Sequence, residues 1–425
     1  MSSNTELQLS FGLEMEFYIF WCKKNKGPAS RPAGFESHPG GPLVIPDEDI
    51  DFDGITGPLQ EAIRNLLKGA PIVTVTPPDG WASIGQKYDE DWEHLRQYTN
   101  WAVKIDISLL ALPTDLAEMN RGDYGWCGVE VISPALWATN GAFNQVREVC
   151  EFLQRTFWTS TAPQAGLHVH VGNGNLWFSL TQLRQIAAFI YAADPILAQI
   201  HPEYRLTNST YCPSLRLYSN VSLGLKNIPS TTAGVDSITA APSPSTYVQW
   251  ARGLLRNISR AFWPEKNAGS RAEEHYPPRP KPVPISDAVA EILQAPDREA
   301  LADLMEVYRK RAAYSFNQLA WEVKRTIEFR QAASTVDPAE VVSQVRIAVR
   351  ACEFAATADF EKFQKIIFDC STAEDDPGWF DVYDLFLELN LRPEAKIVQA
   401  ALDGTMSDSI RQEYWSNFSN KEKNG

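Results

Sequence analysis

Apolar and polar positions alternate at the start of the chain and predict a β-strand there. Residues 9–20 read LSFGLEMEFYIF, in which every odd-numbered position is apolar and the even-numbered positions include Glu14 and Glu16. Because the side chains of a strand point alternately to its two faces, both glutamates lie opposite the apolar row, roughly 7 Å apart at about 3.3 Å per residue. Taken alone, this pair also fits a strand with one face in water. The other predicted strands are needed to distinguish a solvated face from a functional site.

Five further segments alternate in the same way. They span residues 71–78, 101–112, 127–136, 166–174 and 324–331. Four of these segments carry charged or titratable side chains on the face opposite their apolar residues. These side chains are Lys104, Asp106, Glu130, His168, His170, Glu328 and Arg330. The pattern therefore predicts several strands with one apolar and one polar face.

Segments with helical spacing separate the predicted strands. Apolar residues recur with the period of an α-helix in residues 57–69, 141–158 and 287–314, and again after Asp337. Ser179 and Gln182 form a capping box that begins another helix. We therefore expect an α+β fold, in which one face of the sheet packs on helices and the other face lines a site.

We expect one catalytic domain to span residues 1–425. Within it, residues 229–284 are rich in Ser, Thr, Ala and Pro and end in a proline-rich segment, which is typical of an insertion that forms a loop or a lid. Residues 285–370 are expected to supply helices and the final catalytic strand, and residues 371–425 a C-terminal helical extension.

Composition narrows the class of protein. The 425 residues include 39 Lys and Arg against 53 Asp and Glu, a net charge of −14, which argues against a nucleic-acid partner. The six cysteines include no C-x-x-C pair, which favours reduced thiols over disulfides or zinc. The N-terminus lacks a secretory signal pattern and no apolar run reaches about 18 residues, so we expect a cytoplasmic protein without a membrane span.

Four carboxylates and two imidazoles lie on the polar faces of four predicted strands. They are Glu14, Glu16, Glu130, His168, His170 and Glu328. Carboxylates that converge in a dry site need cations, since like charges would otherwise raise their pKa values and protonate them. Glutamates with few histidines and no cysteine favour Mg²⁺ or Mn²⁺ over Zn²⁺. Such ions commonly serve phosphoryl transfer, for which Arg330 adds a fixed cation beside Glu328. No G-x-x-x-x-G-K-[ST] loop is present, so a nucleotide site must be built from these side chains and metals.

Six short motifs occur in a fixed order. They are FGLEMEF, the D-x-S-L of KIDISL, GVEVISPAL, GLHVHVG, the R-x-x-x-x-FN of RAAYSFN, and TIEFR. This series, over roughly residues 9 to 350, resembles the amidoligase family of carboxylate–amine ligases. The catalytic sheet of that family is similar to those of glutamine synthetase and glutamate–cysteine ligase.

The resemblance implies a curved, mainly antiparallel sheet of the glutamine synthetase catalytic type, with helices packed on its outer face. It also implies that the sheet holds ATP and two or more Mg²⁺ (or Mn²⁺) ions. The residues that match metal ligands by position are Glu14, Glu16, Glu130, His168 and Glu328. His170 matches a position close to the nucleotide phosphates, and Arg330 matches the arginine that stabilises the transferred phosphoryl group. Lys324 or Arg325 would assist with phosphate.

Three further residues are candidates for contacts with substrate. Asp106 could orient or deprotonate the incoming ammonium, or it could cap a turn at the end of its strand. Arg205 and Arg311 could each bind a substrate carboxylate or a phosphate through a bidentate pair, or could play structural roles.

These residues predict an ATP- and Mg²⁺-dependent ligase that joins a carboxylate, from an amino acid or peptide-like molecule, to an amine through an acyl phosphate. Its partners would be small-molecule acids and amines, and related synthetases often form homo-oligomers. Three alternatives stay open: a phosphotransferase that acts on a guanidino nitrogen, a catalytically silent nucleotide- and metal-binding protein, and a metal-dependent hydrolase. The hydrolase would not need Arg330 beside a metal-binding glutamate.

Overall fold

The computed structural model describes most of the chain. The described residues are 7–28, 30–46, 53–67, 100–174, 176–206, 211–226, 282–307, 312–320 and 325–421. The strand expected at residues 71–78 and nearly all of the expected insertion at 229–284 lie outside them, as do Arg311 and Lys324. Among the described residues, no helix combines the length and the hydrophobicity that crossing a membrane requires.

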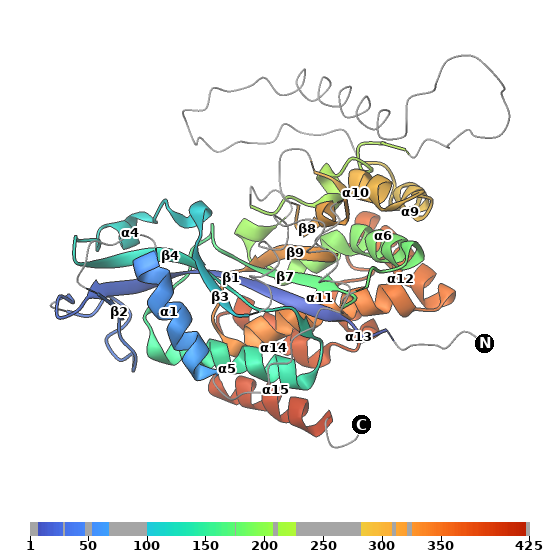
Figure 1. Ribbon diagram of the computed structural model, residues 1–425. Coiled ribbons are helices and arrows are strands. Elements are labelled where there is room, and N and C mark those ends of the chain that lie inside the picture. The colour runs from blue at the N-terminus through green and yellow to red at the C-terminus, as the bar shows by residue number, and fades with distance from the viewer. Residues whose placement is uncertain are drawn as a thin grey trace, which may run out of the picture. The chain divides into compact units, whose positions relative to one another are not determined.

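In the described residues, nine strands form one open, mainly antiparallel sheet (Figure 1). In spatial order, its main path consists of β3 (Ala102–Ile105), β4 (Tyr124–Ile132), β1 (Ser10–Lys23), β7 (Gly166–Gly172), β9 (Thr326–Ala333) and β8 (Tyr314–Ser315). Three short strands also pair with β1: β2 (Leu43–Ile45), β5 (Leu136–Trp137) and β6 (Thr159–Ser160). Only β2 runs parallel to β1. The expected mixture of helices with a mainly antiparallel sheet is confirmed.

Some helices lie between the strands in the chain, and α11 to α15 follow the last strand. The α-helices are α1 (Asp53–Leu66), α4 (Thr114–Ala117), α5 (Asn140–Thr156), α6 (Leu180–Leu197), α7 (Leu215–Tyr218), α9 (Ile285–Leu293), α10 (Arg298–Met305), α11 (Pro338–Thr357), α12 (Phe360–Asp375), α13 (Val382–Glu388), α14 (Arg392–Leu402) and α15 (Asp408–Lys421). Four short 3₁₀ helices are η1 (Ile107–Leu109), η2 (Ala198–Ile200), η3 (Glu203–Arg205) and η4 (Asn317–Ala320). The capping box predicted at Ser179 is present and begins α6.

One face of the sheet packs against α5 and α11 (Figure 1). The odd-numbered residues of β1 supply this contact: Phe11 stacks on Phe143 of α5 with ring centroids 5.4 Å apart, and Met15 contacts Cys150 of the same helix. These side chains are buried, so the apolar row that marked the first strand forms the core between the sheet and the helices.

The other face of the sheet changes character along its length. A compact cluster of buried, largely aromatic residues covers one end of it. The cluster consists of Tyr18, Phe20, Leu109, Leu116, Trp126, Trp158 and Ala165. Glu14 and Glu16 precede Tyr18 on the same face of β1, so the acidic part of the face borders a dry aromatic part.

Two predicted elements are shorter in the structure. The strand expected over residues 101–112 ends at Ile105, because the Asp106 carboxylate accepts hydrogen bonds from the backbone N–H and hydroxyl of Ser108 and caps η1. Ile107, expected on the buried face of that strand, is 81% exposed. The helix expected over residues 287–314 is interrupted after α9, where Pro296 precedes Asp297, the N-cap of α10.

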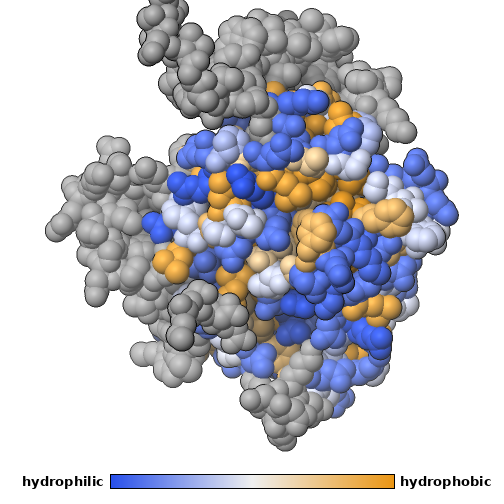
Figure 2. All heavy atoms as spheres, turned by 90° about the vertical axis from the view of Figure 1, so that its right-hand side faces the viewer, coloured by the Kyte–Doolittle hydropathy of each residue, from blue (hydrophilic) through white to orange (hydrophobic). Residues whose placement is uncertain are grey.

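Hydrophobic residues also reach the surface on the helix side of the molecule. Figure 2 shows orange patches of such residues between hydrophilic ones on this face. The exposed apolar side chains of the described residues include Phe360 and Phe368 of α12, and Trp379 before α13.

Candidate active site

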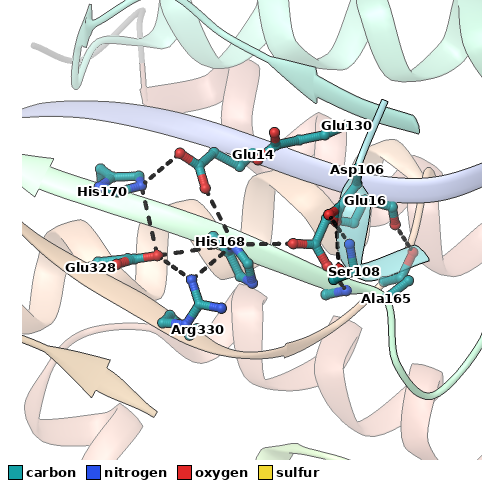
Figure 3. Close-up of polar contacts among 12 residues, drawn as sticks. Glu14, Glu16, Asp106, Ser108, Glu130, Ala165, His168, His170, Glu328 and Arg330 are labelled. Atoms are coloured by element: carbon teal, nitrogen blue, oxygen red, sulfur yellow. Dashed lines mark hydrogen bonds and ion pairs between the residues drawn. The ribbon is translucent and has the colours of Figure 1, made fainter. Parts of the chain in front are cut away.

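The pairing of four strands brings the predicted acids and histidines to one face of the sheet (Figure 3). In the antiparallel ladders, Glu14 lies opposite His168, Glu16 lies opposite Glu130, and His170 lies opposite Glu328. Residues directly opposite each other have Cβ atoms about 5 Å apart, so the register alone places these side chains within reach of one another. All are buried except Glu130, which is partly exposed.

Glu14, His170 and Glu328 form the tightest group. One ligand atom from each residue lies within 4.8 Å of the other two. His170 Nε2 is 3.2 Å from Glu14 Oε1 and 4.0 Å from Glu328 Oε1, and its Nδ1 lies 3.2 Å from the Thr326 hydroxyl, which fixes the ring. Two buried carboxylates with one imidazole fit a hard divalent cation such as Mg²⁺ or Mn²⁺. The structure thus brings His170, which was matched to the nucleotide phosphates, into a potential metal-binding group.

His168 lies beside this group. Its Nδ1 is 3.3 Å from Glu14 Oε2, 3.5 Å from Glu16 Oε1 and 3.3 Å from Arg330 Nη1. Burial and the Arg330 charge lower the pKa of His168, so the ring is neutral. Its metal-binding role stays a prediction; its place between two glutamates and an arginine is compatible with it.

The two carboxylates of the tight group are held ionised. Burial raises the pKa of Glu328, but the charges of His170 and Arg330 outweigh burial and bring the pKa to about 2. Burial acts on Glu14 in the same direction, and again His170 and the hydrogen bond from His168 outweigh it, so the pKa of Glu14 is also lowered. Ionised carboxylates are the form that binds a metal ion.

The pKa values of Glu16 and Glu130, in contrast, are raised. Burial and Asp106 raise the pKa of Glu16 to about 8, although the backbone N–H of Gly166 donates to its Oε2 at 2.7 Å. Burial and Glu14 raise the pKa of Glu130 to about 7, although Lys104 Nζ lies 3.0 Å from its Oε2. Without a cation this part of the site holds protons near neutral pH, and a bound cation would displace them.

Arg330 contacts both histidine and glutamate. Its Nη1 donates to Glu328 Oε1, and its Nε is buried without a hydrogen-bond partner in the part of the chain that the structure describes. The register of β9 against β7 shifts at this side chain: Val169 pairs with Phe329 and Leu167 pairs with Ala332, so β9 has one residue more than β7 between the two pairs. Ordinary alternation places Arg330 on the face of Glu328, and Gln331 turns to the opposite side.

The structure places the remaining predicted residues differently. Asp106 caps η1 and still lies close enough to raise the pKa of both Glu16 and Glu130. Arg205 is buried at the end of η3 and donates from Nη2 to the carbonyl oxygen of Ala165. Arg325 lies with its guanidinium 5.4 Å from the ring of Trp177. Lys324 and Arg311 lie outside the described residues.

Three neighbours of the site were not predicted as site residues. Lys104 pairs with Glu130, Thr326 contacts His170, and Ser315 of β8 lies opposite Glu328. Lys104 and Thr326 have the same parity as Asp106 and Glu328 on their segments, so the alternation could have found them. Ser315 belongs to a two-residue strand, which gives no such signal.

A comparison with protein families identifies the class of protein. The family model described as a putative amidoligase enzyme matches residues 8–219. The chain belongs to this amidoligase family, which confirms the resemblance seen in the motifs. The match contains Glu14, Glu16, Glu130, His168 and His170, while Glu328 and Arg330 on β9 lie beyond it. A search among curated proteins gave no match. Family membership indicates an enzyme, in general terms an ATP-dependent ligase.

Proposed function

We propose that the protein is an ATP- and Mg²⁺-dependent ligase that forms an amide bond between a carboxylate and an amine. The observation that carries the proposal is the convergence of Glu14, His170 and Glu328, with Arg330 bonded to Glu328. Strands β1 to β7 of the sheet lie within the residues that match the family. We further propose that the sheet is of the glutamine synthetase catalytic type, which its antiparallel order and its face of acids and histidines support.

The chemistry explains why such a site is needed. A carboxylate does not condense with an amine in water, because its oxygen is a poor leaving group. Transfer of the γ-phosphoryl group of ATP to the carboxylate gives an acyl phosphate and ADP. The amine then attacks the acyl carbon, loses a proton, and displaces inorganic phosphate, which leaves the amide. Each step needs close alignment, charge stabilisation and exclusion of water.

Each group of residues has a part in this reaction. Glu14, His170 and Glu328 would hold a Mg²⁺ ion, and Glu16, Glu130 and His168 a further one; bound there, the ions neutralise the phosphate charge. Arg330 already donates Nη1 to Glu328, so its buried Nε can stabilise the charge on the transferred phosphoryl group. Asp106 would orient the ammonium of the amine substrate and accept its proton. Arg325, the residue before β9, would contact a phosphate.

Location and assembly complete the proposal. Six free cysteines in the described residues, five of them buried, suit a reducing compartment, and we place the enzyme in the cytoplasm. Its substrates would be small molecules, an amino acid or peptide-like acid and an amine. A homo-oligomer is proposed from the resemblance to synthetases and is testable by light scattering.

The test is a coupled assay on the full chain. The protein is incubated with ATP, Mg²⁺, hydroxylamine as the amine, and a broad panel of acids, and ADP and hydroxamate are measured. We expect both products with at least one acid, loss of both in Glu328→Gln, and unchanged rates in Glu118→Gln, an exposed glutamate of the loop after α4. Absence of ADP and hydroxamate across the panel would contradict the proposal. A stable phosphorylated product without hydroxylamine would favour the guanidino phosphotransferase instead.

A further inference from the structure

Arg205 carries a buried charge without an acidic partner. Arg205 is 2% exposed, and its Nη2 donates to the carbonyl oxygen of Ala165. Among the described residues, its Nε is buried without a hydrogen-bond partner and no carboxylate forms an ion pair with it. Burying a charged group costs several kcal/mol unless an opposite charge and hydrogen bonds compensate it, so the guanidinium would be stabilised by a bound anion.

The other buried arginines show what compensation looks like. Arg216, also 2% exposed, donates from Nε and Nη2 to the two carboxylate oxygens of Glu374 at 2.5 and 2.9 Å, and from Nη1 to the Tyr191 hydroxyl. Arg330 is paired with Glu328. Arg205 differs from both, because within the described ranges its guanidinium donates only to a neutral carbonyl oxygen.

The Arg205 guanidinium borders the active site. A Cβ added at Gly166 of β7 would lie 3.1 Å from Arg205 Nη2 and 3.0 Å from His168 Nε2, so the guanidinium and the imidazole flank the same small space. The backbone N–H of Gly166 donates to Glu16. A larger residue here would push one of the two side chains aside by a few tenths of an ångström, and the shared space places Arg205 on the face that carries the acids.

Contacts to the backbone of Arg205 and to its guanidinium hold the residue in place. Gln331 Nε2 donates to the carbonyl oxygen of Arg205 at 3.1 Å, and Gln331 in turn accepts from the Tyr314 hydroxyl at 2.8 Å. The ring of Tyr211 lies 5.5 Å from the guanidinium carbon. A guanidinium held in this way keeps its planar fork ready for a carboxylate or a phosphate.

His168 separates the two arginines of the site. Arg330 Nη1 lies 3.3 Å from His168 Nδ1, at the end of the site with Glu328 and the potential metal ligands, whereas Arg205 is on the side of Nε2. The γ-phosphoryl group and the reacting carboxylate belong at the Arg330 end. The anion at Arg205 is therefore a different one, and it stays charged during the reaction.

We propose that Arg205 binds a second carboxylate of the acid substrate, so that the acid is a dicarboxylate or an α-amino acid with a side-chain carboxylate. The assignment of that anion to a substrate rests on the proposed ligase function. A guanidinium binds both planar carboxylates and tetrahedral phosphates. The experiment therefore distinguishes a carboxylate ligand of Arg205 from a phosphate ligand.

The first experiment needs no turnover. Thermal unfolding of the full chain is followed during titration with succinate, glutarate or glutamate, with butyrate as the monocarboxylate and inorganic phosphate and Mg²⁺–ATP as phosphate probes. We expect at least one of the two-carboxylate probes to raise the Tm of the wild type, butyrate to have little effect, and the rise to vanish in Arg205→Met. Arg205→Lys keeps the charge without the fork, and its half-saturating concentration should be at least tenfold higher.

Stability of the ligand-free variants separates binding from a structural role. Arg205→Met removes an uncompensated charge and should leave the Tm unchanged or raise it. The matched control, Glu374→Gln, takes a partner from the buried Arg216 and should lower the Tm while keeping the rise with glutamate or glutarate. An Arg205→Met protein that is markedly less stable than wild type would overturn the proposal, and so would a misfolded Arg205→Met together with an Arg205→Lys that retains wild-type affinity.

The remaining outcomes distinguish the two proposals. A rise in Tm with phosphate or Mg²⁺–ATP that disappears in Arg205→Met, while the rise with glutarate persists, would make Arg205 a phosphate contact and overturn the inference. Butyrate that binds as well as glutarate would also overturn it. If no acid supports ADP formation but the Arg205-dependent rise is seen, the ligase proposal fails and the carboxylate site stands. In an active enzyme, Arg205→Lys should raise the KM for the acid and leave the KM for ATP unchanged.

Discussion

Glu16 of β1 and Glu130 of β4 lie directly opposite each other in the sheet, with their acidic side chains on the same face. Like charges at such positions destabilise a sheet. The pKa of Glu16 is raised to about 8 and that of Glu130 to about 7, burial being the main cause in both. The protein thus keeps an unfavourable pair of acids at its centre, which is expected where a cation binds.

Removing one of these acids should raise the stability of the metal-free protein and weaken metal binding. In the metal-free protein near pH 8, we expect Glu130→Gln to raise the free energy of unfolding by about 1 kcal/mol, because Glu16 and Asp106 then face a neutral amide. Millimolar Mg²⁺ should raise the Tm of wild type more than that of the variant. Urea and thermal unfolding in EDTA and in Mg²⁺ measure both effects, with Glu118→Gln as the control. Equal Mg²⁺ responses in the wild type and Glu130→Gln would remove Glu130 from the metal site.

Arg330 should matter for the rate more than for ATP binding. Arg330→Lys keeps a positive charge but loses the Nε donor and the bidentate fork, so we expect kcat to fall by about 10²-fold or more with a small change in the KM for ATP. Steady-state ADP release measures both constants, and circular dichroism checks the fold. The control is Arg121→Lys, an exposed arginine that donates only to backbone carbonyls. A rate within twofold of wild type would place the phosphoryl group elsewhere.

Gly128 of β4 packs against η1, whose N-cap is Asp106, so a substitution at Gly128 should affect Asp106. A Cβ at Gly128 would overlap Leu109 of η1, which is fully buried in the aromatic cluster, so η1 and its cap Asp106 must shift. We expect Gly128→Ala to lower the free energy of unfolding by about 1–3 kcal/mol and to reduce turnover. Gly122→Ala is the matched control, since nothing lies within 4 Å of its added Cβ. Identical stability and activity of the two variants would contradict this coupling.

Glu340 in the first turn of α11 should make stability depend on pH. Burial and the neighbouring Asp337 raise its pKa from 4.5 to about 7, although Thr335 and Arg411 oppose the rise. A raised pKa means that the folded state holds the proton more tightly, so its contribution to stability is full below pH 4.5 and is lost as pH rises through 7. The shift corresponds to at most about 3 kcal/mol.

The comparison with Glu340→Gln isolates this contribution. Between pH 5 and pH 8, the free energy of unfolding of wild type should fall relative to that of Glu340→Gln, whose amide does not titrate. Urea unfolding across this range measures the difference, and the exposed Glu361→Gln should behave as wild type. Parallel pH profiles for wild type and Glu340→Gln would show that Glu340 titrates normally.

The sequence predicts which side chains share a face, because alternation is a local property. Glu14 and Glu16, and likewise His168 and His170, were expected on the polar faces of their strands, and the structure has them there. Register is not local. It places Glu14 opposite His168 and His170 opposite Glu328, and it brings His170 into the tight group, which no pattern within one strand could indicate.

Irregular backbone is the second limit on prediction. The alternation of KIDISL continues past Asp106, yet the Asp106 side chain bonds to Ser108 and turns the chain into η1. The environment of Arg205 is a third limit on prediction. Whether a buried arginine has a carboxylate partner depends on contacts between distant segments, and Arg205 has none among the described residues. Such features need coordinates, because their energies come from side-chain and tertiary interactions that short-range periodicity does not contain.

The bulge in β9 contains both Arg330 and Gln331, the residue that contacts the backbone of Arg205. Arg330 lies on one side of the bulge and points to Glu328, and the next residue, Gln331, holds the backbone of Arg205 from the other side of the sheet. A one-residue deletion at this point would restore regular pairing and leave a single residue between the two pairs. One of the two contacts, that of Arg330 with Glu328 or that of Gln331 with Arg205, would then be lost, so the extra residue in β9 lets one strand hold both arginines.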